Sequence, residues 1–231
     1  MVDAQKAGIG GSAGMRPHER LEASRLENQG LARHGLHRPD HETIAAYETH
    51  AAAYAQSWES QPADDELHEL LEKFLLPGTV AEIGCGSGRD AAWLAAHGWQ
   101  VTGYDASSAL VGEARRLHPE TRFEIATLPA LDGLPTFDNV YCETVIMHLE
   151  PAAAMESVRR LGGLLRPGGR LYLSWRADGS SDRRDERGRL YTKITVDQVL
   201  GEIEGFAVLY RSETTSASSG KRVCRIVAQR P

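Results

Sequence analysis

A glycine-rich turn between a strand and a helix is the part of this sequence best suited to chemistry. Residues 79–107 read TVAEIGCGSGRDAAWLAAHGWQVTGYDAS. A short apolar run leads into Gly84, Gly86 and Gly88, and a helical pattern follows at once. Glycines permit a sharp turn and let a ligand approach main-chain N–H groups, and the first amides of a helix are unpaired at the same place. The pattern predicts a ligand-binding loop after the first strand.

A carboxylate follows at the end of the next predicted strand. Asp105 stands 17 residues after Gly88, where a side chain can accept both hydroxyls of a ribose. A nicotinamide or flavin dinucleotide would require a third glycine at the position of Arg89, so that the helix could pack tightly. The spacing present is G-x-G-x-G, with Glu82 two residues before the first glycine. This spacing argues against a dehydrogenase.

Together with two later motifs, these residues resemble the class I S-adenosylmethionine-dependent methyltransferases. EIGCGSG and Asp105 resemble the first two motifs of that family. FDNVYC at 137–142, followed by VIMHL at 145–149, resembles its fourth strand and the continuation of that strand. LLRPGG at 164–169 resembles the turn into its fifth strand. The resemblance extends over residues 41–231.

The resemblance implies that S-adenosyl-L-methionine is the methyl donor and S-adenosyl-L-homocysteine the product. It also implies a set of cofactor-binding residues: Glu82, Gly84, Cys85, Gly86, Gly88, Asp105, Ala106, Thr127, Leu128, Cys142 and Glu143. In this interpretation Glu82 holds the α-ammonium and Asp105 takes the ribose hydroxyls. Cys142 and Glu143 lie near the sulfonium and the bound methionine. Thr127 departs from the family pattern, which often has an acidic residue there, so backbone contacts would serve the adenine.

Other side chains are candidates for handling the methyl acceptor. Transfer from a sulfonium is an in-line displacement governed by proximity and alignment, so it requires neither a metal nor a covalent nucleophile. His148 is the candidate general base, because histidine titrates near neutral pH; the alternative is a histidine packed at a turn. Tyr54 and Trp58 would form an aromatic lid, or only a buried helix face. Arg176 and Arg184 would clamp an acidic group of the acceptor, or belong to a solvated loop.

Alternating strands and helices must position these residues. We expect strands at 79–84, 99–104, 121–126, 137–142, 169–175, 205–211 and 222–229, and helices at 88–97, 107–117, 151–166 and 194–203. This alternation predicts an α/β fold, a Rossmann-like, seven-stranded, mostly parallel sheet with helices on both faces. No helical pattern separates the last two strands, which predicts a C-terminal antiparallel hairpin.

The chain before the first strand divides into two parts. Residues 1–40 show neither a helix nor a strand period and are predicted to be a flexible tail or a lid. Residues 41–231 are then the methyltransferase-like domain, in which 41–76 form a helical cap. Asp40 is placed to cap a helix whose apolar residues recur at three-four spacing. A second helix, at about 64–76, begins with acidic residues and ends before Pro77.

Composition narrows the class of protein. The net charge of the 231 residues is −6, so the whole protein lacks the basic field that would make a nucleic-acid partner expected. The three cysteines form no CxxC pair, and Pro39 separates His37 from His41, so no metal site is expected. No apolar run approaches the roughly 20 residues that span a bilayer. We expect a cytoplasmic protein without membrane contact.

The sequence therefore favours a methyltransferase that acts on a small molecule. Two alternatives remain: an RNA or protein methyltransferase on the same core, and a non-catalytic cofactor-binding protein. CETV at 142–145 replaces the Asn/Asp-Pro-Pro-aromatic motif associated with planar amide or exocyclic amine nitrogens, which argues against a DNA adenine methylase. No sequence feature indicates the oligomeric state or the acceptor atom.

Overall fold

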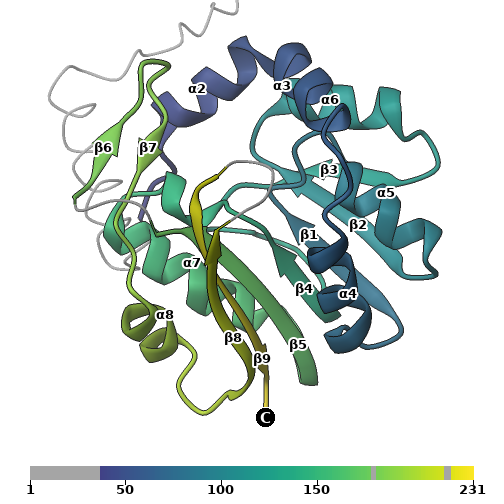
Figure 1. Cartoon of the computed structure of the whole chain (residues 1–231), viewed down its shortest axis with the longest axis vertical. Helices are drawn as coiled ribbons and strands as arrows, with labels where there is room; N and C mark the ends of the chain where they lie inside the picture. Colours follow the sequence, from purple (N-terminus) through teal and green to yellow (C-terminus); the bar gives the residue numbers. More distant parts are fainter. Residues whose placement is uncertain (1–36, 178–180, 216–219) are drawn as a thin grey trace, which may run out of the picture. The chain divides into compact units, whose positions relative to one another are not determined.

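A mixed sheet forms the centre of the molecule. The computed structural model describes residues 37–177, 181–215 and 220–231. The sheet has the strand order β3-β2-β1-β4-β5-β9-β8 (Figure 1). Its strands are β1 (Thr79–Ile83), β2 (Gln100–Asp105), β3 (Arg122–Ile125), β4 (Phe137–Cys142), β5 (Leu165–Arg176), β8 (Ala207–Thr215) and β9 (Arg222–Gln229). The first five are parallel, and β9 runs antiparallel to both β5 and β8. The predicted sheet and its C-terminal antiparallel hairpin are confirmed.

The strand order reverses beside β1. This strand pairs with β2 on one side and with β4 on the other. The chain therefore adds β2 and β3 toward one edge of the sheet and β4 and β5 toward the other edge. In open α/β sheets the crevice outside the carboxyl ends of the strands at such a reversal is the usual ligand site. The glycine loop follows β1 directly and therefore lies at this crevice.

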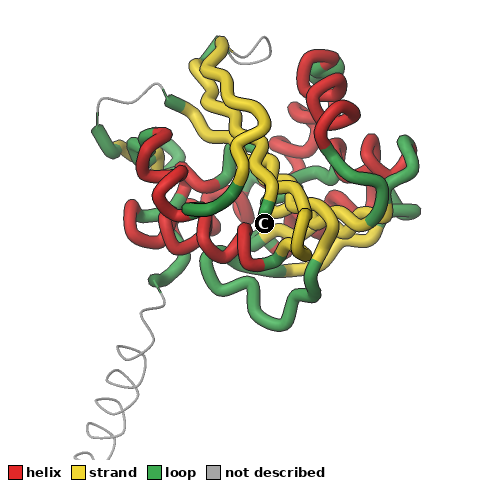
Figure 2. Tube along the Cα trace, turned by 90° about the horizontal axis from the view of Figure 1, so that it is seen from below, coloured by secondary structure: helices red, strands yellow, loops and turns green. Residues whose placement is uncertain are grey.

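Helices cover both faces of the sheet, as Figure 2 shows. They are α4 (Asp65–Phe74), α5 (Arg89–Ala96), α6 (Ser108–Leu117), α7 (Pro151–Gly163) and α8 (Val196–Glu202). Because side chains alternate across a strand, Tyr141 and Tyr172 pack in a cluster with residues of α4 and α5. Their neighbours Val140 and Leu171 pack in the cluster that contains α7 and α8. Burial on both faces explains the nearly continuous apolar runs of the central strands.

The helices of the predicted cap, residues 41–76, pack in two different places, on α6 and on the sheet. Asp40 caps α2 (His41–Thr49), accepting a hydrogen bond from the Thr43 amide at 2.8 Å. The expected single helix is interrupted at His50 (φ −118°, ψ 19°), and α3 (Ala51–Glu59) follows. Tyr54 of α3 packs with Leu110 of α6, whereas α4 packs on the sheet. Only α2 and α3 therefore lie over α6.

Two carboxylates attach α2 and α3 to the rest of the domain. Glu48 accepts hydrogen bonds from the Ser108 and Ala109 amides at the start of α6, where a negative charge also suits the helix dipole. Glu59 accepts a hydrogen bond from the Ser87 hydroxyl at 2.7 Å. The glycine loop and α6 are thus both bonded to the helices above them.

The segment after β5 contains structure that we expected only as a loop. Two short strands, β6 (Arg183–Arg184) and β7 (Leu190–Tyr191), form a separate antiparallel sheet. A tight turn joins them, in which the Gly188 amide donates to the Asp185 carbonyl at 2.9 Å and Gly188 has φ 86°. Figure 1 shows this hairpin beside α2.

A second difference lies in α7, which ends at Gly163 and not at residue 166. The cause is β5, which begins at Leu165 by pairing with Phe137. The pairing shifts register across the PGG turn before it resumes between Asn139 and Arg170. The turn motif therefore belongs to the strand.

Gly88 provides a direct test of the loop packing. It has φ 83°, and a Cβ there would lie 2.4 Å from Phe123 Cζ. Gly98 has a similar φ of 97°, but a Cβ there would meet open space. We predict that Gly88→Ala lowers the free energy of unfolding by about 3 kcal/mol, from strain plus overpacking, and that Gly98→Ala lowers it by about 1 kcal/mol, from strain alone. Urea denaturation measures both, and equal losses would contradict the packing.

Candidate functional site

A cavity of about 310 Å³ opens at the carboxyl ends of β1 to β5. Most of the residues singled out in the sequence line it: Trp58, Glu82, Gly84, Cys85, Gly86, Asp105, Ala106, Thr127, Leu128, Glu143, His148 and Arg176. Four others do not: Tyr54, Gly88, Cys142 and Arg184. The fold therefore brings the cofactor and acceptor candidates into one space.

The glycine loop forms the floor beside β1. The amides of Gly84 and Cys85 both donate to the Tyr104 carbonyl, at 2.7 and 3.0 Å. Gly86 has φ 55°, and a Cβ there would lie 2.8 Å from the ring of Trp58. Trp58 thus lies directly against the loop. Gly88 is the N-cap residue of α5 and packs against Phe123 of β3, so its role is structural.

Asp105 is held by the loop across from it. Its Oδ2 accepts a hydrogen bond from the Gly86 amide at 3.0 Å, and its Oδ1 accepts one from Ser107 at 2.8 Å. Desolvation raises the pKa of Asp105, while these amides lower it. Each carboxylate oxygen has a second lone pair, so Asp105 can still accept two hydroxyl groups of a ligand.

Glu82 is a buried carboxylate with an unused oxygen. Its side chain is 4% exposed, and Oε2 has no hydrogen-bond partner among the described residues. Burial raises the pKa of Glu82 well above its usual value, and the neighbouring carboxylates of Asp90 and Asp105 raise it further. A buried carboxylate without a partner is costly. This position is therefore suited to a ligand cation.

Glu143, by contrast, is satisfied by the protein. It accepts hydrogen bonds from the Tyr172 hydroxyl at 2.6 Å and the Ser174 hydroxyl at 2.7 Å. Burial raises the pKa of Glu143, and Arg225 lowers it. Cys142 precedes it by one residue and belongs to the core on the other side of the strand. Burial raises the pKa of its thiol, so Cys142 is a packing residue.

His148 is held in one tautomer. It ends the short helix η1 (Ile146–His148). Its Nδ1 lies 2.6 Å from the Leu190 carbonyl, and its Nε2 lies 3.1 Å from the Tyr47 hydroxyl. Because a carbonyl only accepts, Nδ1 carries the proton and Nε2 accepts from Tyr47. Burial lowers the pKa of His148 to about 4, so the ring is neutral near pH 7.

Arg184 joins the β6–β7 hairpin to α2. Its Nη1 and Nη2 donate to the two carboxylate oxygens of Asp40, at 2.9 and 2.6 Å, and this contact lowers the pKa of Asp40 to about 2. Nearby, the Leu190 amide donates to the Thr43 hydroxyl at 2.9 Å. Arg184 thus positions the hairpin rather than lining the cavity.

Of the two aromatic residues of α3 that were expected to form a lid, only one lines the cavity. Tyr54 stacks on Trp58 with ring centroids 5.4 Å apart, and only Trp58 lines the cavity. The cavity residues that the sequence analysis did not identify include Tyr47, Arg189 and Tyr191. The D-x-x-G spacing of Asp185 and Gly188 is the signal that would have predicted the hairpin and, through strand alternation, placed residues 189 and 191 on one side.

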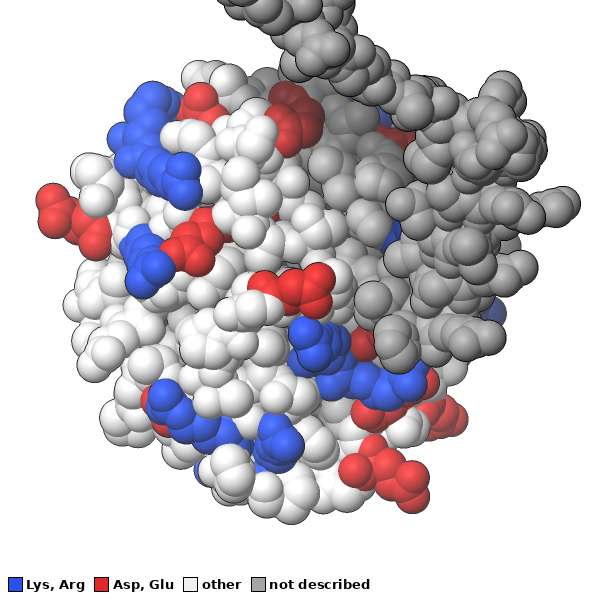
Figure 3. Space-filling view, turned by 180° about the vertical axis from the view of Figure 1, so that it is seen from behind, with Lys and Arg blue, Asp and Glu red and all other residues white. Residues whose placement is uncertain are grey.

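The described residues contain neither a membrane-spanning helix nor a cluster of metal ligands. In this part of the chain no helix is both long and apolar enough to cross a bilayer. The same residues contain no group of three or more His, Cys, Asp and Glu placed to hold a metal ion. On the face shown in Figure 3, Lys and Arg are interspersed with Asp and Glu.

Part of the chain matches a known protein family. Residues 81–171 match the model of the methyltransferase domain family. Over this stretch the chain is similar to that family. The matched residues run from β1 to the centre of β5 and include the glycine loop, Asp105 and the LLRPGG turn. The class I resemblance predicted from those motifs is confirmed.

The chain is also similar to a curated protein, the ubiquinone biosynthesis O-methyltransferase of Stutzerimonas stutzeri. The two are 31% identical over 150 residues, which is 58% of this chain and 62% of the relative. The chain thus matches about three-fifths of the length of that relative.

Solved structures share the fold. The 1,6-didemethyltoxoflavin-N1-methyltransferase of Burkholderia thailandensis, with bound 1,6-didemethyltoxoflavin and S-adenosylhomocysteine, has a TM-score of 0.56 at 22% identity. The match covers 99% of this chain and 93% of that one. Phosphoethanolamine N-methyltransferase 2 of Haemonchus contortus, in complex with S-adenosyl-L-methionine, has a TM-score of 0.64 at 18% identity. That match covers 80% of this chain and 57% of the other.

The environment of His148 predicts a pH dependence of stability. The unfolded chain binds a proton at His148 near pH 6.5, whereas the folded protein does so only near pH 4. The unfolded state therefore holds more protons between these values, and the free energy of unfolding falls as the pH falls through this window. We predict that His148 contributes about 2 kcal/mol to the decrease between pH 7 and pH 5. Urea denaturation of the wild type and His148→Gln at both pH values measures this contribution, and equal pH slopes would contradict it.

Proposed function

We propose that the methyltransferase domain binds S-adenosylmethionine in this cavity and catalyses transfer of its methyl group to a small-molecule acceptor. One observation carries the proposal: the unpartnered, buried Oε2 of Glu82 beside the glycine loop. The methionine part of this cofactor carries an ammonium group, which would donate to that oxygen. A buried carboxylate oxygen that lacks a partner in the protein gains one from the ligand.

The neighbouring residues fit the remaining parts of the cofactor. Asp105 is already oriented by the Gly86 amide and would accept hydrogen bonds from the ribose hydroxyls. Trp58 would cover the methionine side of the loop. Thr127 and Leu128 line the cavity after β3, where the adenine would lie. These contacts come from four separate elements, so the folded domain forms the site before the ligand arrives.

When bound, S-adenosylmethionine supplies a methyl group activated by a sulfonium. The protein then has to orient the acceptor and exclude water, because an in-line displacement depends on alignment. Tyr47 and Tyr191 would contact the acceptor from above. A proton lost by the acceptor would pass to His148 Nε2 through the Tyr47 hydroxyl, which already donates to it. The low pKa of His148 makes it a weak base, so alignment is the larger contribution.

The acceptor atom favoured by the relatives is an oxygen. The curated relative is named an O-methyltransferase, whereas the two solved structures are named N-methyltransferases and match at lower identity. A hydroxyl acceptor also suits the Tyr47–His148 pair, which can take its proton. We therefore propose O-methylation of a small hydroxylated compound, in the cytoplasm and without a nucleic-acid partner.

Glu82→Gln tests the proposal. The substitution removes the charge that would pair with the ammonium, so we predict that S-adenosylhomocysteine binds at least tenfold more weakly, a loss of about 1.4 kcal/mol or more. The free energy of unfolding should stay equal or rise, because the variant no longer buries an unpaired carboxylate. Isothermal titration calorimetry and urea denaturation measure the two effects.

Glu120→Gln, at an exposed position, is the matched control and should change neither quantity. Unchanged affinity in Glu82→Gln, or a wild type that does not bind S-adenosylhomocysteine, would contradict the proposed site. Binding with no turnover on any hydroxylated acceptor would instead favour a non-catalytic cofactor-binding protein.

A further inference from the structure

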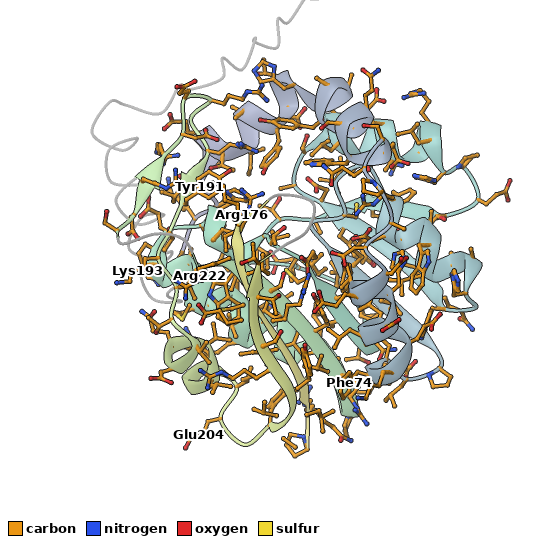
Figure 4. The ribbon with its side chains drawn as sticks, viewed as in Figure 1. Phe74, Arg176, Tyr191, Lys193, Glu204 and Arg222 are labelled. Carbon is orange, nitrogen blue, oxygen red and sulfur yellow. The ribbon has the colours of Figure 1, made fainter. Side chains whose placement is uncertain are left out.

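Three guanidinium groups gather around one tyrosine ring. Arg176, Arg183 and Arg189 lie 5.8, 5.0 and 5.7 Å from the ring centroid of Tyr191. We call these three residues the arginine cluster. Figure 4 shows Arg176, at the end of β5, near Tyr191 of β7. Within residues 37–177, 181–215 and 220–231, only Arg189 of the three has an ion pair, with Asp185 at 2.7 Å. The cluster therefore carries excess positive charge.

Two members of the arginine cluster face the proposed site. Arg176 and Arg189 line the cavity, whereas Arg183 does not. The Nε and Nη2 atoms of Arg189 bind Asp185, and its guanidinium also forms a hydrogen bond with Tyr47 at the cavity wall. Arg176 has no carboxylate partner among the described residues. Like charges held together in a cavity wall are stabilised by an anion between them.

Aromatic rings hold Arg189 in position. Its guanidinium lies 5.6 Å from the ring centroid of Tyr47, 5.2 Å from that of Tyr54 and 5.7 Å from that of Tyr191. Cation–π contacts orient the planar group and lower the entropy lost when it binds a ligand. Arg189 is therefore preorganised to form hydrogen bonds with an oxyanion.

The cofactor does not account for this positive charge. The proposed contact of its ammonium group is Glu82 of β1, on the side of the cavity next to the glycine loop. The carboxylates of Asp90 and Asp105 add negative charge there. Arg89, next to the glycine loop, also lines the cavity. Its Nε binds Asp90 and its Nη1 donates to the Trp58 carbonyl, so only its Nη2 could reach the carboxylate of the methionine part. Arg176 and Arg189 come from β5 and the hairpin, elements that the proposed cofactor contacts do not use.

We propose that the methyl acceptor carries an oxyanion, a carboxylate or a phosphate, which binds between Arg176 and Arg189 beside Tyr191. This inference rests on the proposed function and names the chemical class of its substrate. The apolar body of the acceptor contacts Tyr47, Met147 and Leu149, which line the same cavity. Arg184, the residue singled out in the sequence for this task, is engaged with Asp40.

The test compares anionic and neutral probes of the same size. The protein is saturated with S-adenosylhomocysteine and titrated with benzoate, phenyl phosphate and benzamide, in separate calorimetric experiments. We expect at least one anion to bind tenfold or more tightly than benzamide, and the tighter of the two identifies carboxylate or phosphate. Arg176→Gln and Arg189→Gln should each abolish this preference and leave the affinity for S-adenosylhomocysteine within twofold of wild type.

Arg159→Gln is the charge-matched control. Arg159 lies on α7 and pairs with Glu202 at the surface, so the variant should keep the preference for the anion. Equal binding of benzamide and both anions, or a preference that survives both cavity substitutions, would overturn the inference. So would weaker S-adenosylhomocysteine binding in the two variants, because the arginines would then serve the cofactor. A wild type that fails to bind S-adenosylhomocysteine would instead contradict the proposed function itself.

Discussion

Three glycines with positive φ hold the loop after β1, and the rest of the site is arranged around that loop. The space that a Cβ would occupy is filled by a different element at each position: Val145 after β4 at Gly84, Trp58 of α3 at Gly86, and Phe123 of β3 at Gly88. The loop is therefore the point at which the sheet and the covering helices meet. The Gly86 amide then orients Asp105, which connects this packing constraint to ligand binding.

Two buried carboxylates show how the domain separates stability from binding. Glu143 receives two hydroxyl donors from β5, so its burial is compensated within the protein. Glu82, on the neighbouring strand β1, keeps one oxygen without a partner. Sites of this kind lower the stability of the free protein and strengthen ligand binding. The contrast between adjacent strands supports a binding role for Glu82 and a structural role for Glu143.

Sequence patterns predicted the sheet and the glycine loop, because strand periodicity and glycine spacing are local features. Most other residues of the cavity were predicted through the resemblance to class I methyltransferases. These patterns did not distinguish Glu143, which lines the cavity, from Cys142, which lies in the core. A shift of one residue moves a side chain to the opposite face of a strand. The role of Arg184 depends on Asp40, which is 144 positions away in the chain, and no local pattern predicts that pair. No local pattern predicts the break at His50 either, whereas the β6–β7 hairpin has a local signal in the D-x-x-G spacing of Asp185 and Gly188. Residues 1–40 were expected to form a tail or lid. Residues 1–36 lie outside the described residues, and Asp40 is buried and caps α2.

A crystal structure of the protein with S-adenosylhomocysteine tests the central claim most directly. The account predicts the amino group of the ligand within hydrogen-bond distance of Glu82 Oε2. It also predicts the ribose hydroxyls on Asp105, while the bond from the Gly86 amide is retained. A ligand bound elsewhere, or one that leaves Glu82 Oε2 without a partner, would contradict the assignment of the cavity.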